Sequence, residues 1–161
     1  MIDRIVKTFK LLNPRWSLDE VLAEVPKFGM QLSQRVGNRC TFVDDDLQKY
    51  SFYFNDNDVI GSVESSLAVE CHVDGMSEPE YERFIASYIG KFEHSSREIQ
   101  SILGDGKYYT LENGAEFPHD RDSIRLSLWK FRDVDIMLEL KHEARDVPVR
   151  LILTLVPRET E

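Results

Sequence analysis

Aspartates gather in two short stretches of the chain. Of all the residues in the sequence, these come closest in type and spacing to a site that could bind or do chemistry. The first stretch is Asp44, Asp45 and Asp46, and the second contains Asp56 and Asp58. Carboxylates crowded on loops repel one another unless a cation meets them, so we expect both stretches to contact a basic partner. The alternative is that both are ordinary solvated turns, because Asn and Asp are common turn residues.

The second stretch does not fit a calcium-binding loop. If Asp56 supplied the first ligand, the twelfth position of the loop, where a carboxylate is required, would be Leu67. We therefore expect a solvated hairpin turn between Asn55 and Asp58.

Histidines and acids also cluster near the C-terminal part. His119, Asp120 and Asp122 precede one strand-like segment, and His142 with Glu143 follows another. A metal site needs three or four converging ligands, whereas neighbours along a strand point to opposite sides. We expect His142 at the rim or in the core with a satisfied hydrogen bond, and no metal or other cofactor.

The sequence contains no motif of nucleophilic catalysis. It has no G-x-S-x-G elbow and no phosphate-binding glycine loop, and neither cysteine lies in an activating setting. The pairs Asp133/Asp135 and Glu139/Glu143 could do acid–base work, but carboxylates on the outward face of an antiparallel sheet are usually its solvated side. We expect a protein that is not an enzyme.

Composition narrows the class of partner. The chain has 161 residues and a formal charge of −9, from 29 acidic and 20 basic residues. This balance disfavours nucleic acid and anionic membrane surfaces, which both bind clustered Lys and Arg. It favours a basic protein partner, whose approach a negative field accelerates.

No apolar run approaches the ~20 residues that span a bilayer. The first residues carry charges throughout, unlike a secretory signal, and two cysteines are too few for a disulfide framework. We expect a cytoplasmic protein.

The sequence contains helix signals near its N-terminus and again from Ser77 onward. Ile2 to Phe9 has helical spacing of apolar residues, and Ser17 followed by Glu20 is a capping box that begins a second helix. A third and longer helix is expected from Ser77 to Leu103, because Ser77 with Glu80 forms another capping box at its start. A second capping pair, Ser95 with Glu98, leaves open whether this segment is one helix or two.

The stretch from Ser123 to Val156 contains three segments in which apolar residues recur at every second position, as in strands. We expect their apolar faces to form one continuous surface that the long helix covers. The residues concerned are Ile124, Leu126 and Leu128, then Val134, Ile136, Leu138 and Leu140, and finally Val149, Leu151, Leu153 and Leu155.

Trp129 is expected on the opposite face, together with Phe131. It is either buried beneath the N-terminal helices or part of an exposed contact patch. We keep Trp129 as a candidate partner-binding residue, with burial as the alternative.

The pattern as a whole predicts an α+β fold in one domain, residues 1–161. An antiparallel β-sheet of about six to eight strands packs against one long central helix, with two short N-terminal helices.

The C-terminal pattern resembles the closing meander of small acidic bacterial immunity proteins of polymorphic-toxin and contact-dependent systems. It consists of a Trp-bearing strand, a turn, IMLELKHE, a short charged loop and PVRLILTLVP. The matching positions are Trp129, Leu138, Leu140, His142, Glu143, Pro148 and Leu151. The resemblance implies a single-domain α+β protein that binds and blocks a cognate toxin. No binding residue is carried over, because such interfaces differ between toxin pairs.

Two other functions stay open. The chain is also similar to type III secretion chaperones, which are acidic α/β modules that bind an unfolded effector segment, although those generally end with a helix. A small-ligand-binding domain would need a cavity between helix and sheet, and a pocket lined by Tyr81, Tyr88 and Trp129 would favour it.

Overall fold

The computed structural model describes residues 1–70, 73–110, 123–142 and 144–158. Within these residues, eight strands form one antiparallel sheet in the order β1-β2-β3-β4-β8-β7-β6-β5. The strands are β1 (Gln31–Val36), β2 (Arg39–Val43), β3 (Lys49–Phe54), β4 (Ile60–Glu70), β5 (Lys107–Thr110), β6 (Ser123–Phe131), β7 (Val134–Lys141) and β8 (Val149–Pro157). The helices are α1 (Ile2–Leu11), α2 (Leu18–Glu24), the 3₁₀ turn η1 (Val25–Phe28) and α3 (Glu78–Leu103). The predicted α+β class, the long helix and the short N-terminal helices are confirmed.

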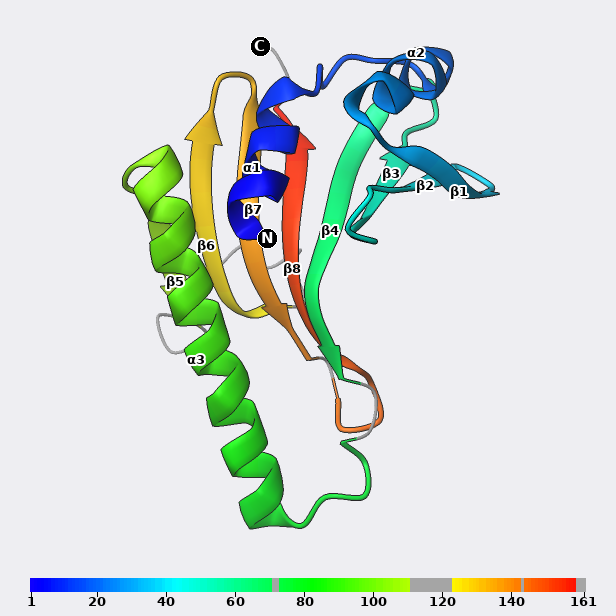
Figure 1. The fold of residues 1–161 in the computed structure, drawn as a ribbon. Helices are drawn as coiled ribbons and strands as arrows, with labels where there is room; N and C mark the ends of the chain where they lie inside the picture. The colour runs from blue at the N-terminus through cyan, green and yellow to red at the C-terminus, as the bar shows by residue number, and fades with distance from the viewer. Residues whose placement is uncertain (71–72, 111–122, 143, 159–161) are drawn as a thin grey trace.

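Helices α1 and α3 lie on the same face of β6, β7 and β8 (Figure 1). α3 buries Tyr88, Phe92 and Ile99 against the sheet, and its first half extends past the lower end of the strands. It is continuous, so the possible break near Ser95 does not occur. Ser95 is 6% exposed and belongs to the packed side of the helix instead of capping a new one.

Both predicted capping boxes are present. The backbone N–H of Ser17 donates to Glu20 Oε2 over 2.8 Å, and Glu20 N–H donates back to Ser17 Oγ over 3.3 Å. At the start of α3, the Ser77 N–H and hydroxyl donate to Glu80 Oε2 over 2.8 and 2.6 Å. The bonds donated by backbone N–H groups satisfy donors that the start of each helix leaves without helical partners.

The prediction that Leu126 and Leu128 of β6 lie on the helix-covered face of the sheet is wrong. Only Arg132 and Asp133 connect β6 to β7, so Phe131 pairs with Val134 and Trp129 pairs with Ile136. A two-residue connection fixes strand register, and a shift of one residue exchanges the two faces of a strand. Trp129 therefore lies on the helix-covered side, in the place expected for the leucines.

Leu126 and Leu128 instead join Met137, Tyr109 and Val156 in a second, smaller apolar cluster. Ile124 packs in the main core as expected, because a register shift between Ser123 and Arg125 inserts one extra residue. This part of the sheet is apolar on both faces.

A similar irregularity alters β4. The register with β8 shifts between Ser66 and Ala68, so Leu67 is an extra residue. Residues beyond such a bulge change sides. Val69 is consequently 48% exposed, although uninterrupted alternation along the strand would place it on the same buried face as Val63.

β1 forms one edge of the sheet, and all six of its side chains are exposed. The adjoining strands are well buried, since Phe42, Tyr50 and Phe52 are each 0% exposed. Among the described residues, no helix is long and apolar enough to cross a membrane.

Candidate functional site

The loop between β2 and β3 holds Asp44, Asp45 and Asp46, and Asp44 stabilises it. Asp44 Oδ1 accepts hydrogen bonds from the backbone N–H groups of Asp46 (3.0 Å) and Gln48 (2.9 Å). Leu47 completes the turn with φ 63°. The Asp44 side chain is 11% exposed and that of Asp46 is 65% exposed. Asp44 therefore stabilises the conformation of its own loop, whereas the side chains of Asp45 and Asp46 face solvent.

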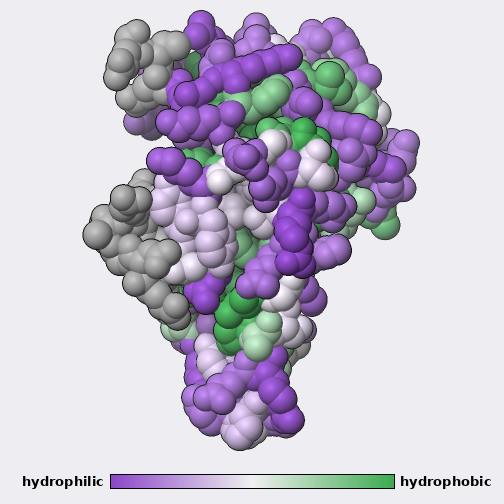
Figure 2. Space-filling model, turned by 90° about the vertical axis from the view of Figure 1, so that its left-hand side faces the viewer, coloured by the Kyte–Doolittle hydropathy of each residue, from purple (hydrophilic) through white to green (hydrophobic). Residues whose placement is uncertain are grey.

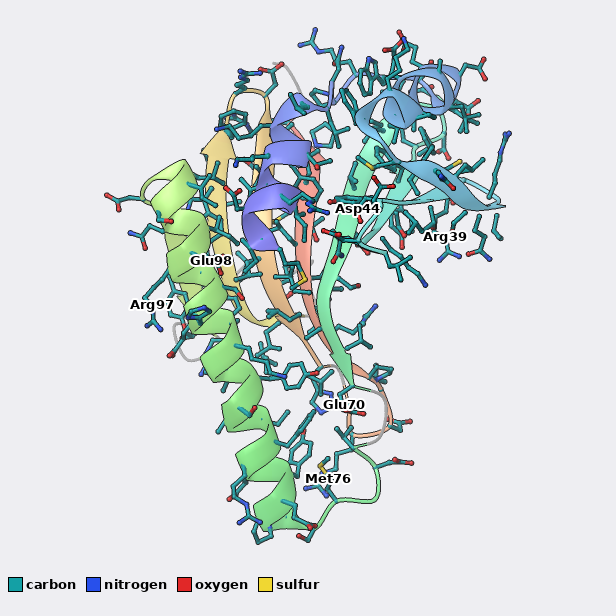
Figure 3. The ribbon with its side chains drawn as sticks, in the orientation of Figure 1. Arg39, Asp44, Glu70, Met76, Arg97 and Glu98 are labelled. Atoms are coloured by element: carbon teal, nitrogen blue, oxygen red, sulfur yellow. The ribbon has the colours of Figure 1, made fainter. Side chains whose placement is uncertain are left out.

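Arg4 of α1 reaches this loop. Its Nη1 lies 3.6 Å from Asp44 Oδ2 and contacts Asp46 Oδ2 more closely. Asp44 lies in the space between α1 and β3 (Figure 3). Because Arg4 is 52% exposed, solvent screens the ion pair, and such pairs are typically worth ~0–1 kcal/mol. A cation supplied by a partner can compete with Arg4 for Asp46.

Tyr50 lies beneath the same loop. Its Oη is 3.5 Å from Asp44 Oδ2. Burial raises the pKa of the Tyr50 phenol; a hydrogen bond with Thr8 acts in the opposite direction, and the charge of Asp44 adds to the increase. The phenol is therefore neutral at physiological pH and serves as a buried support. A shallow hollow of about 440 Å³ separates the loop from Thr8 and Met30.

The loop between β3 and β4 holds Asp56 and Asp58. Asn55 Oδ1 accepts a hydrogen bond from the Asn57 N–H over 3.0 Å, and Asp58 has φ 56°. The Asp58 carbonyl accepts a hydrogen bond from the Leu18 N–H over 2.8 Å, which joins the loop to the start of α2. Both aspartates are exposed. The predicted hairpin turn is confirmed.

The two acidic loops lie at opposite ends of β3. The strand has six residues, a length of ~20 Å at about 3.3 Å per residue. This exceeds the ~8 Å over which exposed charges act at physiological ionic strength. The structure therefore presents two separate acidic surfaces. Asp19 and Glu20, exposed in the first turn of α2, extend the second one.

Trp129 is buried and not part of an exposed patch, as the alternative expected, but it lies on the face of the sheet opposite to the one expected. It is 3% exposed, and its Nε1 donates a hydrogen bond to the Gly104 carbonyl over 3.1 Å. The indole lies beneath the chain that leaves the end of α3, and Gly106 is in close contact with it. In this conformation Trp129 offers almost no surface to a partner.

A third feature lies at the first half of α3, where Tyr81 meets His142. Tyr81 Oη and His142 Nε2 are 2.6 Å apart, so one ring nitrogen of His142 has the expected hydrogen bond, whereas Nδ1 is buried without a partner among the described residues. The pair lines an apolar hollow of about 390 Å³, to which neither Tyr88 nor Trp129 contributes. Its lining is Tyr81, Glu82, Ile85, Ala86, Ile89, Ile124 and His142.

The carboxylates considered for acid–base chemistry have different surroundings. Asp135 Oδ1 lies 3.5 Å from Arg158 Nε. Glu139 is 0% exposed and accepts hydrogen bonds from Ser123 Oγ (3.1 Å) and Thr154 Oγ1 (2.8 Å). Both groups therefore take part in internal polar contacts of the sheet.

Other predicted candidates fall outside the described residues, namely His119, Asp120, Asp122 and Glu143. Within the described ranges, no group of three or more His, Cys, Asp or Glu side chains could hold a metal ion.

Sequence reasoning missed Arg4 and, apart from Tyr81, the residues that line the hollow beside α3. Arg4 and Asp44 are far apart in the sequence, so no local pattern indicates that they are in contact. The hollow does have a signal, because Tyr81, Ile85 and Ile89 recur at intervals of four on one helix face.

No family model, curated protein or solved structure matches this chain. The resemblance to immunity proteins therefore stays a prediction.

Proposed function

We propose that this chain is a non-catalytic protein-binding module, an immunity protein that binds and neutralises a cognate bacterial toxin in the cytoplasm. The observation that carries the proposal is the exposure of Asp45, Asp46, Asp56 and Asp58 on two loops of a chain with a formal charge of −9. Exposed carboxylates steer a basic protein toward the surface and raise its association rate.

The way the carboxylates are held supports binding over chemistry. Glu139 and Asp44 each accept hydrogen bonds from groups of their own chain, and Asp44 supports its loop. The aspartates that we propose meet a partner, Asp45, Asp46, Asp56 and Asp58, are exposed, and exposed carboxylates lack the burial that tunes a general acid or base.

The small-ligand alternative receives less support. A small ligand would be favoured by a cavity between Tyr81, Tyr88 and Trp129, but only Tyr81 lines the hollow beside α3.

Co-expression with the protein encoded directly upstream tests the proposal. We expect the upstream protein alone to arrest bacterial growth and this chain to restore growth, with a complex that survives gel filtration. A control co-expression with an unrelated acidic protein should not restore growth. A neighbour that is harmless, or one whose toxicity this chain does not relieve, contradicts the immunity function.

A further inference from the structure

The hollow beside α3 is a groove with a helical wall, here called the α3 groove. Five of its seven lining residues come from α3, and Ile124 of β6 and His142 complete it. Figure 2 views the molecule from the side on which α3 runs and shows an apolar area in the lower half, surrounded by polar surface. Ile85, Ile89 and Ile124 are only partly buried, so the described part of the chain leaves apolar surface uncovered here.

The α3 groove has the spacing that receives a helix. Tyr81, Ile85 and Ile89 form one row at intervals of four residues, and Glu82 with Ala86 forms the adjacent row. Helices pack by placing the side chains of one row between two rows of the other. Ala86 is the small residue in the middle of the groove and lets another backbone approach closely. From Tyr81 to Ile89 the groove is ~12 Å long, about two turns of a partner helix.

One end of the α3 groove is held in place by polar contacts. Tyr81 is hydrogen-bonded to His142 over 2.6 Å, and the Arg145 guanidinium lies over the Tyr81 ring at 4.3 Å. Arg145 is also paired with Glu78. Because these contacts already fix Tyr81, a partner that packs on it loses little conformational entropy in ordering it.

The same end of the groove is acidic. Glu82 lines it, the first turn of α3 adds Glu78 and Glu80, and Asp74 lies in the turn before the helix; all four are exposed. The described cations nearby are mostly occupied or next to lining residues: Arg145 is paired with Glu78, Lys141 Nζ lies 3.7 Å from Glu139, and Arg83 and Arg125 follow Glu82 and Ile124 in the chain. Apolar surface beside the exposed carboxylate of Glu82 is complementary to an amphipathic helix that carries Lys or Arg next to its apolar stripe.

We infer that the α3 groove binds a basic amphipathic helix of the partner protein, and this inference rests on the proposed function. Two apolar side chains of the partner helix, four residues apart, lie over Ile85, Ala86 and Ile89, and its basic residues face Glu82. A small ligand fits less well, because the groove is open along one side and encloses little of such a molecule.

The test uses a fluorescein-labelled helical peptide of about five turns, with Leu at intervals of three and four and Lys elsewhere. Its affinity for the full chain is measured by fluorescence anisotropy. The control peptides are a scrambled sequence of the same composition and one with Glu replacing Lys. The protein variants are Ala86→Arg, which fills the groove, and Ser87→Arg, which places the same exposed side chain on a different face of α3.

We expect the peptide to bind the unaltered chain and Ala86→Arg to weaken binding at least ~10-fold, with Ser87→Arg within about twofold. Glu82→Lys should also weaken binding, and Glu93→Lys, an exposed site further along α3, should do so less. Glu82→Lys provides the same test if Ala86→Arg does not fold, as circular dichroism would show.

Three results overturn the inference: no binding of the peptide, equal binding of the scrambled peptide, or equal losses from Ala86→Arg and Ser87→Arg. A fourth measurement uses the dye anilinonaphthalene sulfonate. If the dye binds, Ala86→Arg abolishes that binding and the peptide does not bind, the groove is assigned to small ligands and the inference is overturned. The peptide assay contains no toxin, so failure of the neutralisation experiment alone removes the proposed function and leaves the groove result intact.

Discussion

Gly106 lies against the indole of Trp129 so closely that a methyl group on Gly106 would come within 2.6 Å of Trp129 Nε1. The same nitrogen donates a hydrogen bond to the Gly104 carbonyl over 3.1 Å. The Trp129 ring is 3% exposed and cannot swing into solvent without losing this bond and its packing. The chain segment between α3 and β5 is therefore shaped around one side chain.

We predict that Gly106→Ala lowers the free energy of unfolding by about 1–3 kcal/mol, because the added methyl forces Trp129 out of its place. Gly90→Ala is the matched control. Gly90 lies inside α3 with nothing within 4 Å of an added methyl group, so the change should raise stability by about 0.5–1 kcal/mol. Urea unfolding followed by Trp fluorescence measures both, and shifts of the same sign would contradict the prediction.

The elements that the sequence predicts well are those coded by neighbouring residues. The capping boxes at Ser17 and Ser77 involve residues three apart, and the apolar stripe of α3 repeats within a few turns. Such signals depend on local geometry alone. The exposed turns around Asp45 and Asp56 are predicted for the same reason, since Asn and Asp favour turns wherever they occur.

The features that the sequence does not predict depend on distant pairing. The face of Trp129 depends on the two-residue connection at Arg132 and Asp133, which contains no glycine to announce a tight hairpin. The exposure of Val69 depends on the bulge at Leu67. The contact of Arg4 with Asp46 requires α1 to lie beside the β2–β3 loop, and no spacing in the chain encodes that arrangement.

A pH-dependent contribution to stability comes from the cap of α3. Hydrogen bonds from the side chain and then the backbone of Ser77 lower the pKa of Glu80 below the ordinary value of a glutamate. A lowered pKa in the folded state means that this contribution is present above pH 4.5 and is lost as the pH falls through the folded value. We predict that Glu80→Gln lowers the urea midpoint at neutral pH, and that the gap to the unaltered chain narrows in acid.

The control for this prediction is Glu93→Gln, which removes the same charge from an exposed site further along α3. It should shift the midpoint less at neutral pH, because Glu93 does not cap the helix. A gap for Glu80→Gln that stayed constant from neutral to acid pH would show that the charge of Glu80 is not what stabilises the cap.

Arg4 competes with any partner cation for Asp46, so its removal should aid binding. We predict that Arg4→Gln increases the association rate with the basic partner ~2–5-fold at low salt and costs at most ~1 kcal/mol of stability. Lys7→Gln is the matched control, since Lys7 is also on α1 but pairs with Asp3, 2.7 Å away. Stopped-flow mixing measures the rates. Equal acceleration by both variants would mean that only net charge matters.

Neutralising the acidic loops separately tests which of them the partner meets first. We predict that Asp45→Asn with Asp46→Asn, or Asp56→Asn with Asp58→Asn, slows association ~2–10-fold at low salt, and that the effect fades at high salt. Asn tolerates the positive φ of Asp58, and Asp44 is kept because it holds its loop.

The matched control for both loop variants is Asp133→Asn with Glu93→Gln, an equal change of charge at exposed positions outside the two loops and the α3 groove. Because the loops lie ~20 Å apart at opposite ends of β3, their effects should be independent and multiply when all four aspartates are changed. If one pair slows association and the other behaves like the control, the first contact is confined to one end of β3. If neither pair differs from the control at any salt concentration, the two loops play no part in steering the partner.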